Sequence, residues 1–160
     1  MWVAAHAPER VDRLVVCCTS AQLGPPSAWL ERAATVRADG VAAIADAVLG
    51  RWFTPQFAAA HPEVIERMRR QLTATPAEGY AGCCEAVADM DLRGDLPSIV
   101  APTLVLAGGD DPATPPEHGR LVGELIPGAR FEVVSPAAHL ATIERPDRTT
   151  AMILRFLTEP

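Results

Sequence analysis

The stretch PTLVLAGGDDPATPP, residues 102–116, decides the fold. An apolar run at 103–107 ends at a Gly-Gly pair, and two adjacent carboxylates, Asp110 and Asp111, follow before a proline-rich turn. A short continuous apolar run bounded by turn residues is typical of a strand that is buried on both faces, as in a parallel sheet. The stretch therefore predicts an α/β protein and raises the question of what the two acids do.

Similar apolar runs lie on both sides of this stretch. LVVCC at 14–18 and RFEVVS at 130–135 predict two further strands, while PEHGRLVGELI at 116–126 and DRTTAMILRFL at 147–157 have helical periodicity. The alternation of strand and helix indicates a parallel sheet with right-handed crossovers. A sheet of only three strands would leave one long edge unpaired.

The pattern between the first and second strands is helical. Apolar residues recur at three- and four-residue spacing within 41–52 and 62–72, and 76–90 predicts another helix, which contains Gly79 and Gly82. Glycines inside a helix often indicate close packing or room for a ligand. We therefore expect three segments: a helix end and first strand at 1–26, a helical insert at 27–91, and the rest of the core at 92–160.

Composition excludes several classes of function. The hydrophobic share of 49% and the charged share of 21% are those of a globular protein, and the net charge of -6 makes nucleic acid an unfavourable partner. No apolar run approaches the ~20 residues of a membrane span, and the first residues do not form a signal peptide. We therefore predict a soluble cytoplasmic protein without a membrane partner.

The four cysteines form two adjacent pairs, Cys17-Cys18 and Cys83-Cys84. This arrangement is neither a C-x-x-C redox motif nor a zinc-ligand spacing. We expect all four to be small buried residues in a reducing compartment.

Asp111 and His139 are the candidate catalytic residues. Sites in open parallel sheets form beyond the carboxyl ends of the strands, where both residues lie, separated by one helical crossover. A carboxylate beside an imidazole holds its tautomer and stabilises its protonated form, as a general base requires. The alternatives are a turn or helix cap for Asp111 and a structural role for His139, while Asp110 is predicted to be a turn or solvent-facing residue. For His6, His61 and His118 we expect surface or capping roles.

Several segments together resemble the α/β-hydrolase family. GGDDPATPPEHG, AAHL and the last amphipathic helix resemble its C-terminal part, whose G-x-x-D segment implies that Asp111 is the acid of the triad. AAHAPERVDRLVV, RWFTPQF, HPEVIERMRRQL and GYAGCCEAVADMDLR resemble 3-oxoadipate enol-lactonases more specifically. The resemblance covers nearly all of the chain and implies three parallel strands with flanking helices and an inserted helical lid.

One departure from the family concerns the nucleophile. The family carries its serine on a G-x-S-x-G turn, and this sequence contains no such motif, since Ser20, Ser27, Ser98 and Ser135 all lack the flanking glycines. The resemblance therefore implies a serine and an oxyanion hole upstream of Met1. We expect the 160-residue chain by itself to be inactive.

Aromatic residues of the insert are candidates for contact with substrate. Trp52 and Tyr80 are predicted to line the pocket, although these and the neighbouring Trp29, Phe53 and Met68 could instead form the core of the lid. A dicarboxylate substrate would also need an arginine partner, which the sequence does not identify.

The resemblance implies hydrolysis of a small enol-lactone of aromatic catabolism by a Ser-His-Asp triad, with no metal and no organic cofactor. One alternative is another ester, lactone or carbon-carbon bond hydrolase of the same fold. A second is a non-catalytic half-domain that self-associates through its open sheet edge.

Overall fold

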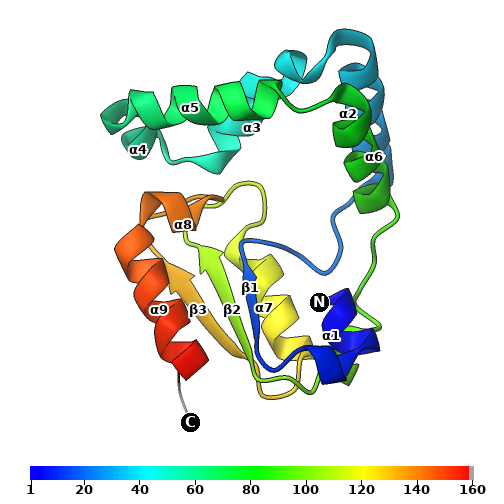
Figure 1. The fold of residues 1–160 in the computed structure, drawn as a ribbon, viewed down its shortest axis with the longest axis vertical. Coiled ribbons are helices and arrows are strands. Elements are labelled where there is room, and N and C mark those ends of the chain that lie inside the picture. Colours follow the sequence, from blue (N-terminus) through cyan, green and yellow to red (C-terminus); the bar gives the residue numbers. More distant parts are fainter. Residues whose placement is uncertain (159–160) are drawn as a thin grey trace. The chain divides into compact units, whose positions relative to one another are not determined.

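A three-stranded parallel sheet organises one part of the molecule (Figure 1). The computed structural model describes residues 1–158, and the chain divides into two units. The sheet unit comprises Met1–Ala21 and Leu92–Pro160, and the helical unit comprises Gln22–Asp91. The three predicted strands and their parallel arrangement are confirmed.

The sheet unit contains the strands β1 (Leu14–Cys17), β2 (Thr103–Gly108) and β3 (Arg130–Val134), the helices α1 (Trp2–His6), α7 (Pro116–Leu125), α8 (Ala141–Glu144) and α9 (Pro146–Thr158), and 3-10 turns at Pro8–Arg10 and Leu96–Ser98. The strands run in the order β1-β2-β3. Cys17 pairs with Leu106 and Gly108 pairs with Val134, so the carboxyl ends of the strands lie along one edge of the sheet.

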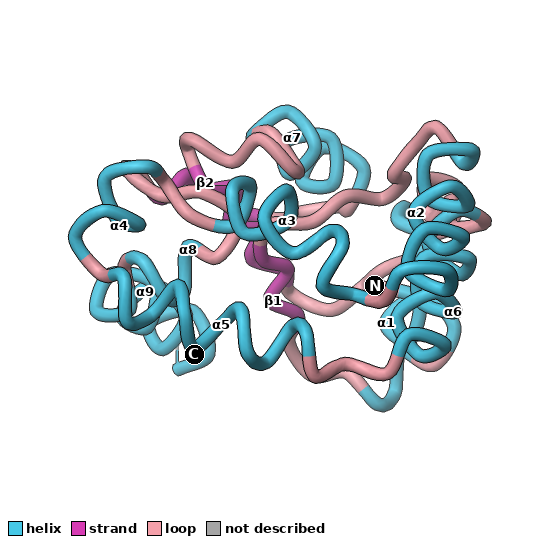
Figure 2. The backbone as a smooth tube through the Cα atoms, turned by 90° about the horizontal axis from the view of Figure 1, so that it is seen from above, coloured by secondary structure: helices cyan, strands magenta, loops and turns pink. Residues whose placement is uncertain are grey.

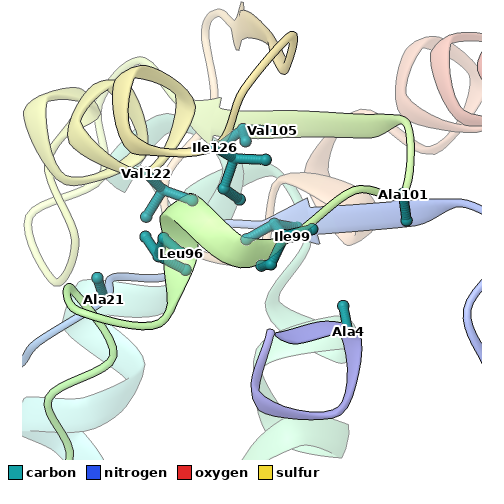
Figure 3. Close-up of a cluster of buried hydrophobic side chains, with 9 residues drawn as sticks. Ala4, Ala21, Leu96, Ile99, Ala101, Val105, Val122 and Ile126 are labelled. Carbon is teal, nitrogen blue, oxygen red and sulfur yellow. The ribbon is translucent and has the colours of Figure 1, made fainter. Parts of the chain in front are cut away.

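Both faces of β2 are covered, which explains its continuous apolar sequence. All six of its residues are buried, and the side chains of Leu104, Val105 and Leu106 alternate between two hydrophobic clusters. Figure 3 shows the first cluster, which joins Val105 to side chains of the segment before β2, of α7 and of the residue after α7: Leu96, Ile99, Val122 and Ile126. The second contains Leu104, Leu106, Val134, Met152 and Phe156. Burial on both faces therefore places β2 at the centre of the core.

The helical unit contains α2 (Pro26–Asp39), a 3-10 turn (Val41–Ile44), α3 (Ala45–Trp52), α4 (Pro55–Ala60), α5 (Pro62–Thr73) and α6 (Ala77–Ala88), and all of its residues are described. Figure 2 shows it as helices joined by loops. A single antiparallel bridge joins Gln22 to Asp91. The unit therefore begins at Gln22, where the two connecting segments pair, whereas the sequence placed the start of the insert at residue 27.

Helices α2 and α6 pack against each other through small residues. Ala33, Ala81 and Cys84 are buried between them, and Arg37 of α2 forms ion pairs with Glu78 and Glu85 of α6. The glycines of α6 do not serve this packing, because a Cβ atom on Gly79 or Gly82 would meet no other group within 4 Å. The close-packing interpretation of these two glycines is therefore wrong.

The four cysteines differ in exposure. Cys18 and Cys84 are buried, as predicted, but Cys17 is only partly buried and Cys83 is exposed. Adjacent residues on a helix point in different directions, so Cys83 and Cys84 cannot both face the packing interface. The prediction is wrong for Cys83 for this reason.

None of the helices within residues 1–158 combines the length and apolar character needed to cross a lipid bilayer.

Candidate active site

The loops after β2 and β3 approach each other closely at the carboxyl edge of the sheet. Gly108 ends β2, and a Cβ atom there would collide with the backbone oxygens of Ala137 and Ala138 in the loop that precedes His139. A Cβ atom on Gly109 would collide with the side chain of Ser135. The Gly-Gly pair therefore does more than end the strand, because it lets the loop that carries His139 pass directly over the loop that carries Asp111.

This close approach joins the two predicted residues. His139 Nδ1 lies 2.8 Å from Asp111 Oδ2, with the Asp111 side chain fully buried and the His139 side chain 25% exposed. The N–H group at Nδ1 donates a hydrogen bond to the carboxylate, which leaves Nε2 as the proton acceptor of the neutral ring. An imidazole held in this tautomer can act as a general base through Nε2.

Asp111 also holds its own loop together. Its Oδ1 accepts hydrogen bonds from the backbone N–H groups of Ala113 at 2.8 Å and Thr114 at 3.0 Å. Both alternatives for Asp111 therefore describe real contacts, since one oxygen closes a turn and the other oxygen faces His139.

Thr114 is a member of the site that the sequence did not identify. Its hydroxyl donates to Asp111 Oδ2 at 2.8 Å and lies 3.2 Å from His139 Nδ1. Its only sequence signal is its position three residues after Asp111, a spacing typical of local hydrogen bonds between side chain and backbone. Thr114 thus fixes the orientation of the carboxylate toward the imidazole.

The electrostatics of the pair favour its charged forms. Burial alone would raise the pKa of Asp111, but hydrogen bonds from His139 and Thr114 outweigh it and hold this pKa below the ordinary value. Burial alone would lower the pKa of His139, but the hydrogen bond and the charge of Asp111 outweigh it and raise this pKa. The buried carboxylate therefore stabilises a proton on the imidazole.

The other singled-out residues of the sheet unit have different surroundings. Asp110 is exposed and lies in the turn after β2, as predicted, and its N–H also donates to the carbonyl of Ala137. His6 is exposed as predicted, as is His61 of the helical unit. His118 differs from the prediction, because its Nδ1 atom is buried without a hydrogen-bond partner.

Trp52 and Tyr80 are both half-buried and belong to the helical unit. Trp52 ends α3, and Tyr80 packs against the α2–α6 cluster, where burial raises its pKa. Their predicted contacts with substrate stay a prediction. Within residues 1–158, no cluster of three or more His, Cys, Asp or Glu side chains could hold a metal ion.

A family model described as the alpha/beta hydrolase fold matches residues 1–146. The parallel sheet and the acid and histidine at its carboxyl edge are consistent with that match. The chain therefore belongs to the α/β-hydrolase family.

Individual relatives narrow the comparison. The chain is 41% identical over 145 residues to 3-oxoadipate enol-lactonase 2 of Acinetobacter baylyi, an alignment that covers 91% of this chain and 54% of that protein. The enol-lactonase of Burkholderia xenovorans LB400 superimposes with a TM-score of 0.95 and 41% identity over 98% of this chain and 60% of that one. A thermophilic esterase of Thermogutta terrifontis superimposes with a TM-score of 0.88 and 34% sequence identity, and the match covers 96% of this chain and 58% of that one. The chain spans little more than half the length of the curated relatives it matches.

Proposed function

We propose that this chain contributes the acid and the base of a lactone hydrolase that opens 3-oxoadipate enol-lactone, or a close analogue, with water in aromatic catabolism. The observation that carries the proposal is the 2.8 Å contact between His139 Nδ1 and Asp111 Oδ2. Its support is the similarity of the chain to proteins named 3-oxoadipate enol-lactonases.

The proposed reaction proceeds through a covalent acyl-enzyme. A serine outside these 160 residues attacks the lactone carbonyl while His139 Nε2 accepts its proton. Collapse of the tetrahedral intermediate breaks the ring C–O bond, and the enol oxygen takes the proton from His139 as it leaves. His139 then removes a proton from water, which hydrolyses the ester and restores the serine. Asp111 orients His139 and stabilises its charge throughout, and no cofactor takes part.

We assign the helical unit the role of a lid that excludes water in the complete enzyme, with Trp52 and Tyr80 contacting substrate. The half-buried state of both aromatic rings supports this role, because part of each ring is available to a ligand. In the complete enzyme, Trp52→Ala is expected to raise KM more than it lowers kcat. A change in kcat alone would contradict the substrate contact.

Two neighbouring acids provide a matched test of the mechanism. In the complete enzyme, D111N is expected to lower kcat by about 10³–10⁴-fold, because the imidazole loses its orienting carboxylate. D110N changes an exposed side chain and is expected to keep near-normal activity. Steady-state hydrolysis of 3-oxoadipate enol-lactone measures both, and activity within tenfold of the unmodified enzyme after His139→Ala would refute the assignment.

Hydrolysis of a different ester is the second candidate, and the similarity to a thermophilic esterase favours it. The two candidate functions are distinguished by measuring kcat/KM of the complete enzyme for the enol-lactone and for a simple aryl ester. A preference for the aryl ester would retain the roles of Asp111 and His139 and reject the lactone.

We also propose that the 160-residue chain alone performs no triad catalysis and self-associates through the open edge of β1. The support is that β1 occupies an edge position in the sheet order. A cytoplasmic location is proposed as well, and the four free cysteines support a reducing compartment.

A further inference from the structure

Cys17 and Cys18 have an arrangement that adjacent strand residues do not normally have. Successive side chains of a strand point to opposite faces, which would separate the two sulfurs. Cys17 is the last residue of β1, and Cys18 follows in the left-handed region with φ 46°, which is uncommon for a residue with a side chain. This turn brings the two Sγ atoms to 3.9 Å, with Cys18 in the buried cluster that contains Leu106 and Cys17 packed against that cluster.

The two thiols differ in acidity. The Cys17 thiol donates to Cys18 Sγ, and this hydrogen bond raises the pKa of Cys17 and lowers that of Cys18. Backbone hydrogen bonds from Gly108 and Ala141 lower the pKa of Cys18 further, against the effect of burial. Cys18 is therefore the thiol of the pair that loses its proton more readily, and the thiolate is the nucleophilic form of cysteine.

The pair lies beside the candidate active site. Gly108 and Ala141 flank the loops of Asp111 and His139, and the charge of Cys18 contributes to the raised pKa of His139. Cys17 is partly exposed, so a small reagent can reach the pair through it.

We propose that Cys17 and Cys18 form a binding site for thiophilic trivalent arsenicals at the carboxyl end of β1, next to the Asp111–His139 pair. The left-handed turn at Cys18 presents two sulfurs that one arsenic atom can bridge. The site is independent of the proposed hydrolysis, because it requires neither the nucleophile nor a substrate.

The binding reaction needs no oxidant or reductant. An arsine oxide loses its oxygen as two As–S bonds form, and the two thiol protons leave with that oxygen as one water molecule. Arsenic remains trivalent and the carbon–arsenic bond stays intact. The expected mass gain is therefore that of one phenylarsine oxide less one water.

The second cysteine pair is a natural control. Cys83 and Cys84 are also adjacent in sequence, but they lie on α6, where neighbouring side chains diverge and one cysteine is exposed while the other is buried. The two pairs fall on different tryptic peptides, residues 14–32 and 71–93. Labelling of one sample can therefore compare them directly.

In the test, the folded, reduced chain is treated with phenylarsine oxide, and the remaining thiols are then alkylated in denaturant. The chain is digested with trypsin and the peptides are measured by mass spectrometry. We expect one arsenical per chain, with peptide 14–32 protected from alkylation about tenfold more than peptide 71–93. The adduct should resist an excess of monothiol and be removed by a dithiol. Treatment in guanidinium chloride should abolish the preference, because the fold creates it.

Variants give a second readout. C83S/C84S should keep the adduct and C17S/C18S should lose it. If C17S/C18S does not fold, peptide mapping of the unmodified chain still decides the outcome. No adduct on the folded chain, equal protection of both peptides, or protection of peptide 71–93 alone would each overturn the proposal.

Discussion

At the scale of single residues, the carboxylate of Asp111 performs two tasks at once. Oδ1 accepts two backbone hydrogen bonds that close the loop after β2, and Oδ2 accepts a hydrogen bond from the N–H group at His139 Nδ1. The structural contact therefore supports the functional one, because a carboxylate anchored through one oxygen presents the other in a defined direction. Thr114 strengthens this arrangement by donating to the oxygen that faces the ring.

The titration of His139 tests this electrostatic arrangement. D111N removes the charge and leaves the burial, so we expect the pKa of His139 to fall from above 6.5 to below it. D110N alters the neighbouring exposed acid and should leave the titration of His139 nearly unchanged. NMR titration of the His139 ring signals measures both variants. An unchanged midpoint in D111N would contradict the assigned hydrogen bond.

The same pair predicts how stability depends on pH. His139 has a raised pKa, so its contribution is fully present below its ordinary value of 6.5 and is lost as pH rises through the raised pKa. Asp111 has a lowered pKa, so its contribution is present above its ordinary value of 3.8 and is lost as pH falls through the lowered pKa. The loss of unfolding free energy caused by H139Q should therefore be largest near about pH 5.

Urea unfolding across the pH range measures this loss of unfolding free energy. D110N is the control, and its free energy of unfolding should depend on pH as that of the unmodified chain does. A loss in H139Q that stays constant from acid to alkaline pH would show that the pair is not ionised in the folded state.

At the scale of secondary-structure elements, glycines have opposite roles at a strand end and within a helix. Gly108 ends β2 where the backbone at Ala137 and Ala138 leaves no room for a side chain. Gly82 lies within α6, where a Cβ atom would meet no other group within 4 Å. The first glycine is required by tertiary packing, and the second only lowers helix propensity.

Alanine at these two positions should therefore change stability in opposite directions. G82A is expected to raise the free energy of unfolding by up to about 1 kcal/mol, since alanine favours the helix. G108A is expected to lower it by about 1–3 kcal/mol, because the new methyl group forces the two loops apart. Denaturant unfolding of the two variants measures the difference. Similar effects from both substitutions would contradict the close approach at Gly108.

At the scale of the whole molecule, the fold places β1 at an edge of the sheet, with one side of its backbone open. The N–H groups of Leu14 and Cys18 donate to the segment of β2, at Pro102 and Leu106. Alternation along a parallel strand therefore directs the N–H groups of Val15 and Cys17 to the open edge. An open edge of this kind is a template for pairing with another chain.

We expect the 160-residue chain to self-associate at tens of micromolar and V15P to weaken this association. Proline at Val15 removes an outward N–H group and keeps the ladder to β2, whereas V16P would break the ladder and serves as the contrasting variant. Sedimentation velocity measures the molecular mass of each. A clean monomer for the unmodified chain, or equal association of V15P, would argue against pairing through this edge.

The sequence by itself determined the three parallel strands and the meeting of Asp111 with His139. Buried strands produce continuous apolar runs, and the carboxyl ends of neighbouring parallel strands lie at one edge of the sheet. These inferences need only periodicity and the order of elements along the chain.

The tertiary structure alone decided the role of Thr114, the need for glycine at position 108 and the approach of the two sulfurs of Cys17 and Cys18. Each depends on the path of a loop or on one backbone torsion angle, which contacts between distant parts of the chain determine. The adjacent pair Cys83-Cys84 shows the difference, because the same two letters on a helix hold one exposed and one buried thiol. Local sequence specifies which side chains are present, and packing specifies which of their atoms meet.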